Sequence, residues 1–149
     1  RGFGTSMPEH HLYFYPRVIR PLEPKALVYA PGLGNAFMFG YTAEETFRLA
    51  QRVVQYARND FPDMPIYVCG FGLFKLQNGL KLPIYAAYEQ WLKELCDEIP
   101  GCTFLDQGAY EPLQKWELLA EDKVHFNNEG YLRYADFFKK VLKHELDQF

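Results

Sequence analysis

The residues in this sequence that could most clearly take part in a reaction are an aspartate and a histidine three residues apart. They are Asp122 and His125, in the stretch DKVHFNNEGY. A histidine can move protons near neutral pH, and a carboxylate on its other ring nitrogen fixes the tautomer that this requires. An aspartate three residues upstream on a tight turn can reach that nitrogen. The same spacing also suits an ordinary polar turn ahead of a helix, so its meaning depends on the surrounding elements.

Those elements alternate between short apolar runs and amphipathic helices. The alternation indicates an α/β fold with a parallel sheet and helices on both faces. The loops after the three runs should then share the carboxyl rim of the sheet, and the third loop carries Asp122 and His125. The predicted strands are 25–30, 65–70 and 102–106, and the predicted helices are 43–59, 83–99 and one capped by Asn128.

Two helix starts carry the pattern of a capping box, a hydroxyl residue followed three residues later by glutamate. Thr42 with Glu45 is predicted to open the helix 43–59, and Ser6 with Glu9 is predicted to open a short helix near the N-terminus. Pro16 should interrupt or restart that first helix.

Two further sites could stabilise an oxyanion. Asn35 follows the first strand in the sequence GLGN, and its side-chain amide can donate to developing negative charge, although a turn role beside two glycines fits it as well. The glycine-rich start RGFGTS offers backbone N–H groups as a second donor, or simply a flexible lead into a helix.

Taken together, these blocks resemble the SGNH (GDSL-like) serine esterase family. DKVHFNNEGY is similar to the family's last block, with Asp122, His125, Gly130 and Tyr131 at the matching positions, and GLGN resembles the block that carries the oxyanion asparagine, Asn35. RGFGTS resembles the glycine-rich block. The resemblance implies a three-layer α/β/α, flavodoxin-like sheet spanning residues 1–149 as one partial domain.

The resemblance also implies roles for these residues. Asp122 and His125 would serve a catalytic serine in ester hydrolysis, with Asn35 and Gly4 as oxyanion donors and no metal or other cofactor. Thr5 replaces Gly4 if the block is aligned one residue later. The substrate would be a small-molecule ester, for example an acylated sugar or lipid.

The sequence departs from the family pattern at two places. Ala36 stands where the family has an aspartate after the asparagine, and the block with the nucleophilic serine has no counterpart. Ser6 is a possible nucleophile, but too few residues precede it for the required strand, and a cap role suits it. We therefore expect the N-terminal strands to be absent. The first strand would be left as an open edge, completed by an N-terminal segment or by a second copy. The alternative is a non-catalytic SGNH-like remnant that acts in binding or assembly.

Composition narrows the remaining possibilities. A net charge of −3 without a basic face argues against nucleic acid as a partner, and no apolar run is long enough to span a bilayer. The adjacent histidines His10 and His11 lack the companions of a metal site. Three cysteines predict buried reduced thiols, which favours a cytoplasmic location, although an N-terminal signal could have been lost; a bridge between Cys96 and Cys102 stays open.

Overall fold

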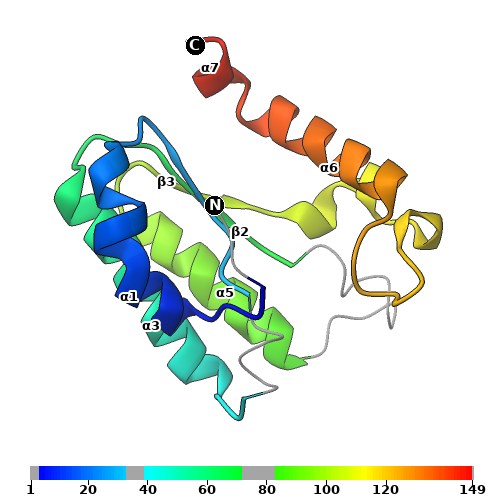
Figure 1. Cartoon of the computed structure of the whole chain (residues 1–149), viewed down its shortest axis with the longest axis horizontal. Helices are drawn as coiled ribbons and strands as arrows, with labels where there is room; N and C mark the ends of the chain where they lie inside the picture. The colour runs from blue at the N-terminus through cyan, green and yellow to red at the C-terminus, as the bar shows by residue number, and fades with distance from the viewer. Residues whose placement is uncertain (1–3, 33–38, 72–82, 149) are drawn as a thin grey trace. The chain divides into compact units, whose positions relative to one another are not determined.

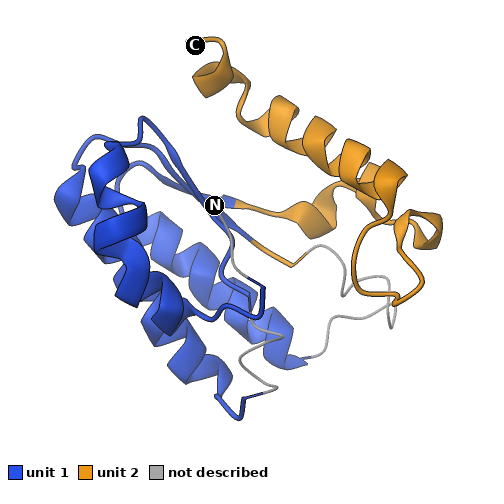
Figure 2. Cartoon of the chain, in the orientation of Figure 1, with its two compact units in different colours: residues 1–69, 83–104 blue, residues 70–82, 105–149 orange. Residues whose placement is uncertain are grey.

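The computed structural model describes residues 4–32, 39–71 and 83–148. The chain divides into two compact units, the first formed by 1–69 with 83–104 and the second by 70–82 with 105–149 (Figure 2). Each unit is considered by itself below. The prediction of a single domain over 1–149 stays a prediction.

Among the described residues the sheet has three strands in the order β1-β2-β3, which are Leu27–Tyr29, Ile66–Cys69 and Cys102–Leu105 (Figure 1). β1 and β2 run parallel, with Leu27 opposite Ile66. The bonds from Ile66 N to Gly101 O and from Gly70 N to Leu105 O join residues the same distance apart in sequence, as a parallel ladder requires. The predicted parallel α/β sheet is confirmed, with each strand shorter than predicted.

Three long helices belong to the first unit: α1 (Pro8–Val18), α3 (Ala43–Asp60) and α5 (Pro83–Glu98). They lie side by side against the strands (Figure 2). The predicted capping box of α3 is present, because the Thr42 hydroxyl accepts from Glu45 N and Glu45 accepts from Thr42 N. Their inward faces join β2 in a core that includes the fully buried Val54, Leu92 and Ile66. A short 3-10 turn, η1 (Arg20–Leu22), follows α1.

The start of α1 differs from the prediction. Its N-cap is Met7, and the side chain that returns to the cap is His10, whose Nδ1 accepts from Met7 N at 3.1 Å. Glu9 instead accepts a hydrogen bond from the Tyr41 hydroxyl at 2.8 Å. The helix also continues through Pro16. Because Pro16 lies near the C-terminal end of α1, the backbone N–H that proline lacks affects only the last turn of the helix. The predicted Ser6–Glu9 capping box and the predicted break at Pro16 are therefore wrong.

The second unit contains three 3-10 turns followed by helices α6 (Asn128–Val141) and α7 (Lys143–Leu146). The turns are η2 (Gln107–Ala109), η3 (Glu111–Leu113) and η4 (Trp116–Leu118). The N-cap of α6 is Asn127, one residue before the predicted Asn128, because the Asn127 side chain accepts from Gly130 N at 2.9 Å. Within α6 Phe137 is buried, whereas Tyr131 and Leu132 are exposed.

No helix among the described residues is both long enough and apolar enough to cross a bilayer.

Candidate functional site

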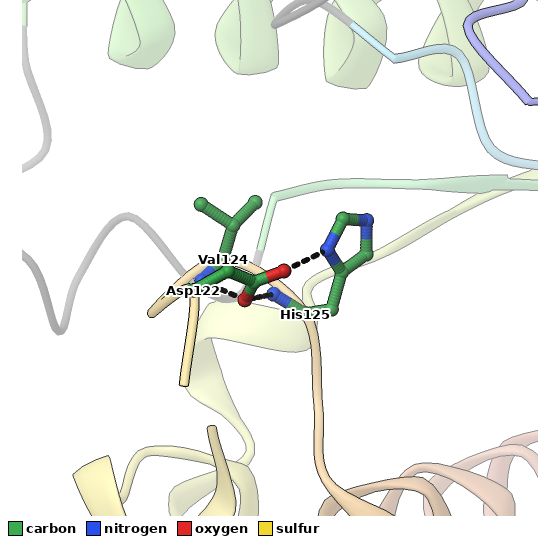
Figure 3. A network of polar contacts seen from close by, with 3 residues as sticks. All are labelled: Asp122, Val124 and His125. Carbon is green, nitrogen blue, oxygen red and sulfur yellow. Dashed lines mark hydrogen bonds and ion pairs between the residues drawn. The ribbon is translucent and has the colours of Figure 1, made fainter. Parts of the chain in front are cut away.

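Asp122 and His125 form a closed hydrogen-bonded turn in the second unit (Figure 3). The Asp122 carboxylate places Oδ2 at 2.6 Å from His125 Nδ1, while Oδ1 accepts from the backbone N–H groups of Val124 and His125, both at 2.9 Å. The turn passes through Lys123, whose φ of 58° is left-handed. The carboxylate thus orients both the backbone and the ring of the histidine.

This arrangement holds Asp122 ionised. The hydrogen bond to the His125 ring, followed by the two backbone N–H donors, lowers the pKa of Asp122 to about 2. A carboxylate ionised at neutral pH can only accept, so Nδ1 of His125 carries a hydrogen, and in the neutral form of the ring the lone pair is on Nε2. The His125 side chain is 70% exposed, which leaves its reactive nitrogen open to a ligand. This is the proton-accepting tautomer that general base catalysis requires.

The loop around the pair is fixed by contacts that the sequence reasoning missed. Ala120 N donates to His125 O at 2.8 Å, and Leu119 pairs with Phe126 in an isolated antiparallel bridge. Asn127 caps α6 and also donates through Nδ2 to the carbonyl of Glu117 at 2.6 Å. The two adjacent asparagines in the sequence signalled a helix cap, but only the fold decides which of them turns inward.

Gly130 has a steric role in the same loop. A Cβ at this position would lie 2.4 Å from the Leu118 carbonyl oxygen and 2.6 Å from Cδ1 of Phe126. Only glycine therefore lets the first turn of α6 pack against the segment that leads to His125. The resemblance pointed to this glycine without giving a physical reason for it.

The other predicted site residues lie outside the described part of the second unit, which holds this pair. Asn35 lies outside the described residues. Gly4 belongs to the first unit, where it is an exposed turn residue, and a Cβ on it would contact nothing within 4 Å. The left-handed residue of that turn is Thr5, with φ of 56°.

Ser6 takes part in a hydrogen-bonded chain that the sequence gave no sign of. Its hydroxyl lies 3.1 Å from His11 Nε2, and His11 Nδ1 lies 3.1 Å from the Tyr29 hydroxyl at the end of β1. Burial, followed by the neighbouring His10, lowers the pKa of His11. Because Tyr29 is 18 residues from His11, no local pattern could have predicted the chain.

Metal ligands do not cluster in the part of the chain that the structure describes: no group of three or more His, Cys, Asp or Glu side chains could hold an ion there. His10 and His11 have separate hydrogen-bond partners, Met7 N for the first and Ser6 with Tyr29 for the second.

Comparison with solved structures identifies the fold. The chain superposes on a GDSL-like lipase from Parabacteroides merdae with a TM-score of 0.74 and 17% identity, covering 94% of this chain and 70% of that one. It matches the acetyl xylan esterase AlAXEase with a TM-score of 0.75 and 18% identity, over 95% of this chain and 79% of the other. A variant of Axe2, an acetyl-xylooligosaccharide esterase from a Geobacillus species, gives 0.74 and 14%, over 94% and 69%.

These likenesses establish the fold: the chain has the three-layer α/β/α architecture of the SGNH hydrolases. A catalytic mutant of Axe2, in which a serine is replaced by alanine, also has this fold, with a TM-score of 0.73. No family model and no curated protein sequence matches the chain.

Proposed function

We propose that this chain is the acid–base part of an SGNH-type ester hydrolase. The observation that carries the proposal is the Asp122–His125 pair, with a 2.6 Å contact from Oδ2 to Nδ1 and an exposed ring. The fold shared with a GDSL-like lipase and two acetyl xylan esterases supports it. The hypothesis from a different class, a non-catalytic SGNH-like remnant, predicts the same fold without turnover.

The proposed mechanism is two-step acyl transfer. A serine hydroxyl attacks the ester carbonyl while His125 Nε2 takes its proton, and His125 then returns that proton to the leaving alcohol. Asp122 holds the Nδ1–H and stabilises the imidazolium that forms. Asn35 and a backbone N–H at Gly4 donate to the tetrahedral oxyanion, and such a donor is typically worth about 3 kcal/mol. In the second step water attacks the acyl-enzyme with the same help from His125, which releases the acid and restores the serine.

We assign the substrate class from chemistry and likeness together. Two of the three neighbours described above are named as esterases of acetylated xylan or xylooligosaccharide. An acetylated sugar is therefore the first substrate to test on this chain, and a lipid ester is the second.

The serine of this mechanism is proposed to lie outside the 149 residues, on a segment that pairs with β1. β1 is the outer strand of the described sheet, and its central residue Val28 is 40% exposed, whereas Ile66 and Val68 of β2 are fully buried. A groove of about 310 Å³ beside β1 is lined by apolar residues of α1 and β1, including Phe14, Val18 and Leu27. About a fifth to a third of each neighbour's chain has no counterpart here, which leaves room for such a segment.

Ester turnover tests the proposal directly. p-Nitrophenyl acetate hydrolysis is measured for this chain and for a longer form that includes residues encoded before Arg1. The longer form should be active and lose at least roughly 100-fold on His125→Ala, while the matched His144→Ala on α7 should keep full activity. Ser6→Ala should also keep activity, since Ser6 contacts His11 and is not the proposed nucleophile. A longer form that releases p-nitrophenol neither in an initial burst nor at a steady rate would support the non-catalytic alternative.

The proposed strand partner has its own test. Sedimentation should show self-association of the 149-residue chain through its open edge, and a monomer for the longer form. If the shorter chain is instead a stable monomer with β1 solvated, the proposed completion at this edge is wrong. A dimer of the longer form would point to a second copy as the partner.

A further inference from the structure

Two of the three cysteines lie in contact at the junction of α5 and β3. Cys96 is in the last turns of α5, Cys102 begins β3, and their Sγ atoms are 3.2 Å apart. The connection is tight because Gly101 takes a left-handed φ of 70° and Cys102 N donates to Ile99 O at 3.1 Å. Both residues belong to the first unit, and no disulfide joins them.

The two thiols differ in access. Cys96 is 4% exposed, on the inner face of α5, whereas Cys102 is only partly buried and follows the exposed Pro100 and Gly101. A reagent from solvent therefore reaches Cys102 first. Cys96 lies behind it, at a distance from which it can attack a group bonded to the Cys102 sulfur.

A guanidinium group lies beside this junction. Arg58 of α3 uses Nη1 to bond the carbonyls of Phe61 and Pro62, at 3.0 and 2.6 Å. Its Nη2 is so close to Gly101 that a Cβ there would lie 3.0 Å away. Nε and Nη2 are buried and have no hydrogen-bond acceptor among the described residues. The junction thus holds a half-buried guanidinium with two buried N–H groups that have no acceptor among the described residues, next to a thiol that can become an anion.

The electrostatics agree with this geometry. The hydrogen bond with Cys96, and then the charge of Arg58, lower the pKa of Cys102, although burial opposes them. The same hydrogen bond and burial raise the pKa of Cys96. Cys102 is therefore the more readily ionised thiol of the pair, and Cys96 is the thiol that holds its proton more tightly.

We propose that Cys102 and Cys96 form a redox-active thiol pair, which a small disulfide such as oxidised glutathione converts into an intramolecular disulfide. The Cys102 thiolate attacks one sulfur of the small disulfide and expels one thiolate, leaving a mixed disulfide on Cys102. Cys96 then loses its proton and attacks the Cys102 sulfur, expelling the second small thiol. Two protein thiols are oxidised by two electrons, and one small disulfide is reduced to two thiols.

The third cysteine serves as an internal control. Cys69 ends β2 and is only 2% exposed, so a reagent from solvent should not reach it. The site is independent of the proposed esterase, because neither cysteine has a role in that mechanism.

Mass spectrometry of the whole 149-residue chain tests the proposal. Treatment with oxidised glutathione should remove two hydrogens without adding glutathione, and should block alkylation of Cys96 and Cys102 after denaturation, with full reversal by dithiothreitol. Cys69→Ser should behave in the same way. Three intact thiols after this treatment, or a stable glutathione adduct on the wild-type chain, would overturn the proposal.

Two variants separate the roles of the pair. Cys96→Ser should stop at the mixed disulfide and carry one glutathione on Cys102, whereas Cys102→Ser should not react.

Arg58→Gln should slow the first step, measured as the rate of iodoacetamide labelling of Cys102 in the native chain. Equal labelling rates for Cys102 and Cys69 would contradict the assignment of Cys102 as the attacking thiolate. Circular dichroism checks that each variant folds, and the wild-type measurement does not depend on them.

Discussion

At the scale of single residues, the Asp122 carboxylate has three acceptor contacts within its own turn. One goes to the ring of His125, and two go to the backbone N–H groups of Val124 and His125. The carboxylate therefore does two things at once: it closes the turn, and it fixes the ring tautomer. A substitution that separates these two effects shows how much of the proposed activity depends on the tautomer.

Asp122→Asn is that substitution. An amide oxygen can still accept from the backbone, but an amide NH2 beside Nδ1 favours the wrong tautomer of His125. In the longer, active form we expect kcat/KM on p-nitrophenyl acetate to fall by roughly 10³ to 10⁴, the size typical of this change in a triad. The neighbouring Glu121→Gln removes a similar charge and should have little effect. A loss below about tenfold for Asp122→Asn would remove Asp122 from the mechanism.

The pKa of Asp122 also predicts a pH dependence of stability. It is lowered to about 2 in the folded chain, from an ordinary value of 3.8. The folded state therefore binds fewer protons than the unfolded state, and the stabilisation is fully present above the ordinary value and is lost as pH falls towards about 2. Urea midpoints of wild type and Asp122→Asn should differ most near pH 6, approach one another as the pH falls below 3.8, and converge only below a pH of about 2. A difference that is independent of pH would contradict this account.

At the scale of elements, the start of α6 positions the whole site. Asn127 caps the helix and ties it to the loop through the Glu117 carbonyl, so the cap and the loop that holds the Asp122–His125 turn form one structure. Gly130 lets that turn approach the loop closely. Two substitution pairs test these contacts.

The first pair compares adjacent asparagines. Asn127→Ala removes the acceptor for Gly130 N and should lower the free energy of unfolding by about 1 kcal/mol, the usual size of a lost N-cap. Asn128→Ala, at the first helical position, should cost much less. Chemical denaturation measures both, and equal losses would mean that Asn127 is not the cap.

The second pair compares two glycines. Gly130→Ala would force a Cβ against the Leu118 carbonyl and the Phe126 side chain, and overpacking of this kind typically costs about 1 to 3 kcal/mol. Gly32→Ala meets nothing within 4 Å and serves as the matched control. A neutral Gly130→Ala, measured by urea denaturation, would show that the loop moves aside without cost.

At the scale of the whole molecule, the question is what covers the outer edge of β1. Leu27 N–H donates to Pro65 O at 2.9 Å, so the alternation of a strand turns Val28 N–H towards the other edge. An open edge of this kind is a site for pairing with another segment.

Amide exchange tests this at one residue. In the 149-residue chain the Val28 amide should exchange rapidly while the Leu27 amide is protected. In the longer form both should be protected, because the added strand accepts from Val28 N–H. Protection of Val28 in the shorter chain at low concentration would contradict an open edge, and rapid exchange of Val28 in the longer form would contradict pairing there.

Much of the fold could be predicted from the sequence because the signals are local. Three apolar runs alternating with amphipathic helices predicted the parallel sheet, and the Thr42–Glu45 pair predicted the start of α3, since both residues of a capping box lie within one turn. Asp122 and His125 are likewise close enough in sequence for their spacing to predict a contact. The Ser6–Glu9 pattern was equally local but failed, because Tyr41 binds Glu9 and His11 binds Ser6.

The sequence by itself therefore determined the alternation of elements and the turn that joins Asp122 to His125, since both arise within a few residues of chain. Only the tertiary structure decided the outer position of β1 in the sheet, the contact of Ser6 with His11 and Tyr29, and the approach of Arg58 to the Cys96–Cys102 junction. Each of these depends on which distant segments pack together. Burial and charge then give a side chain a partner that its sequence neighbours do not show.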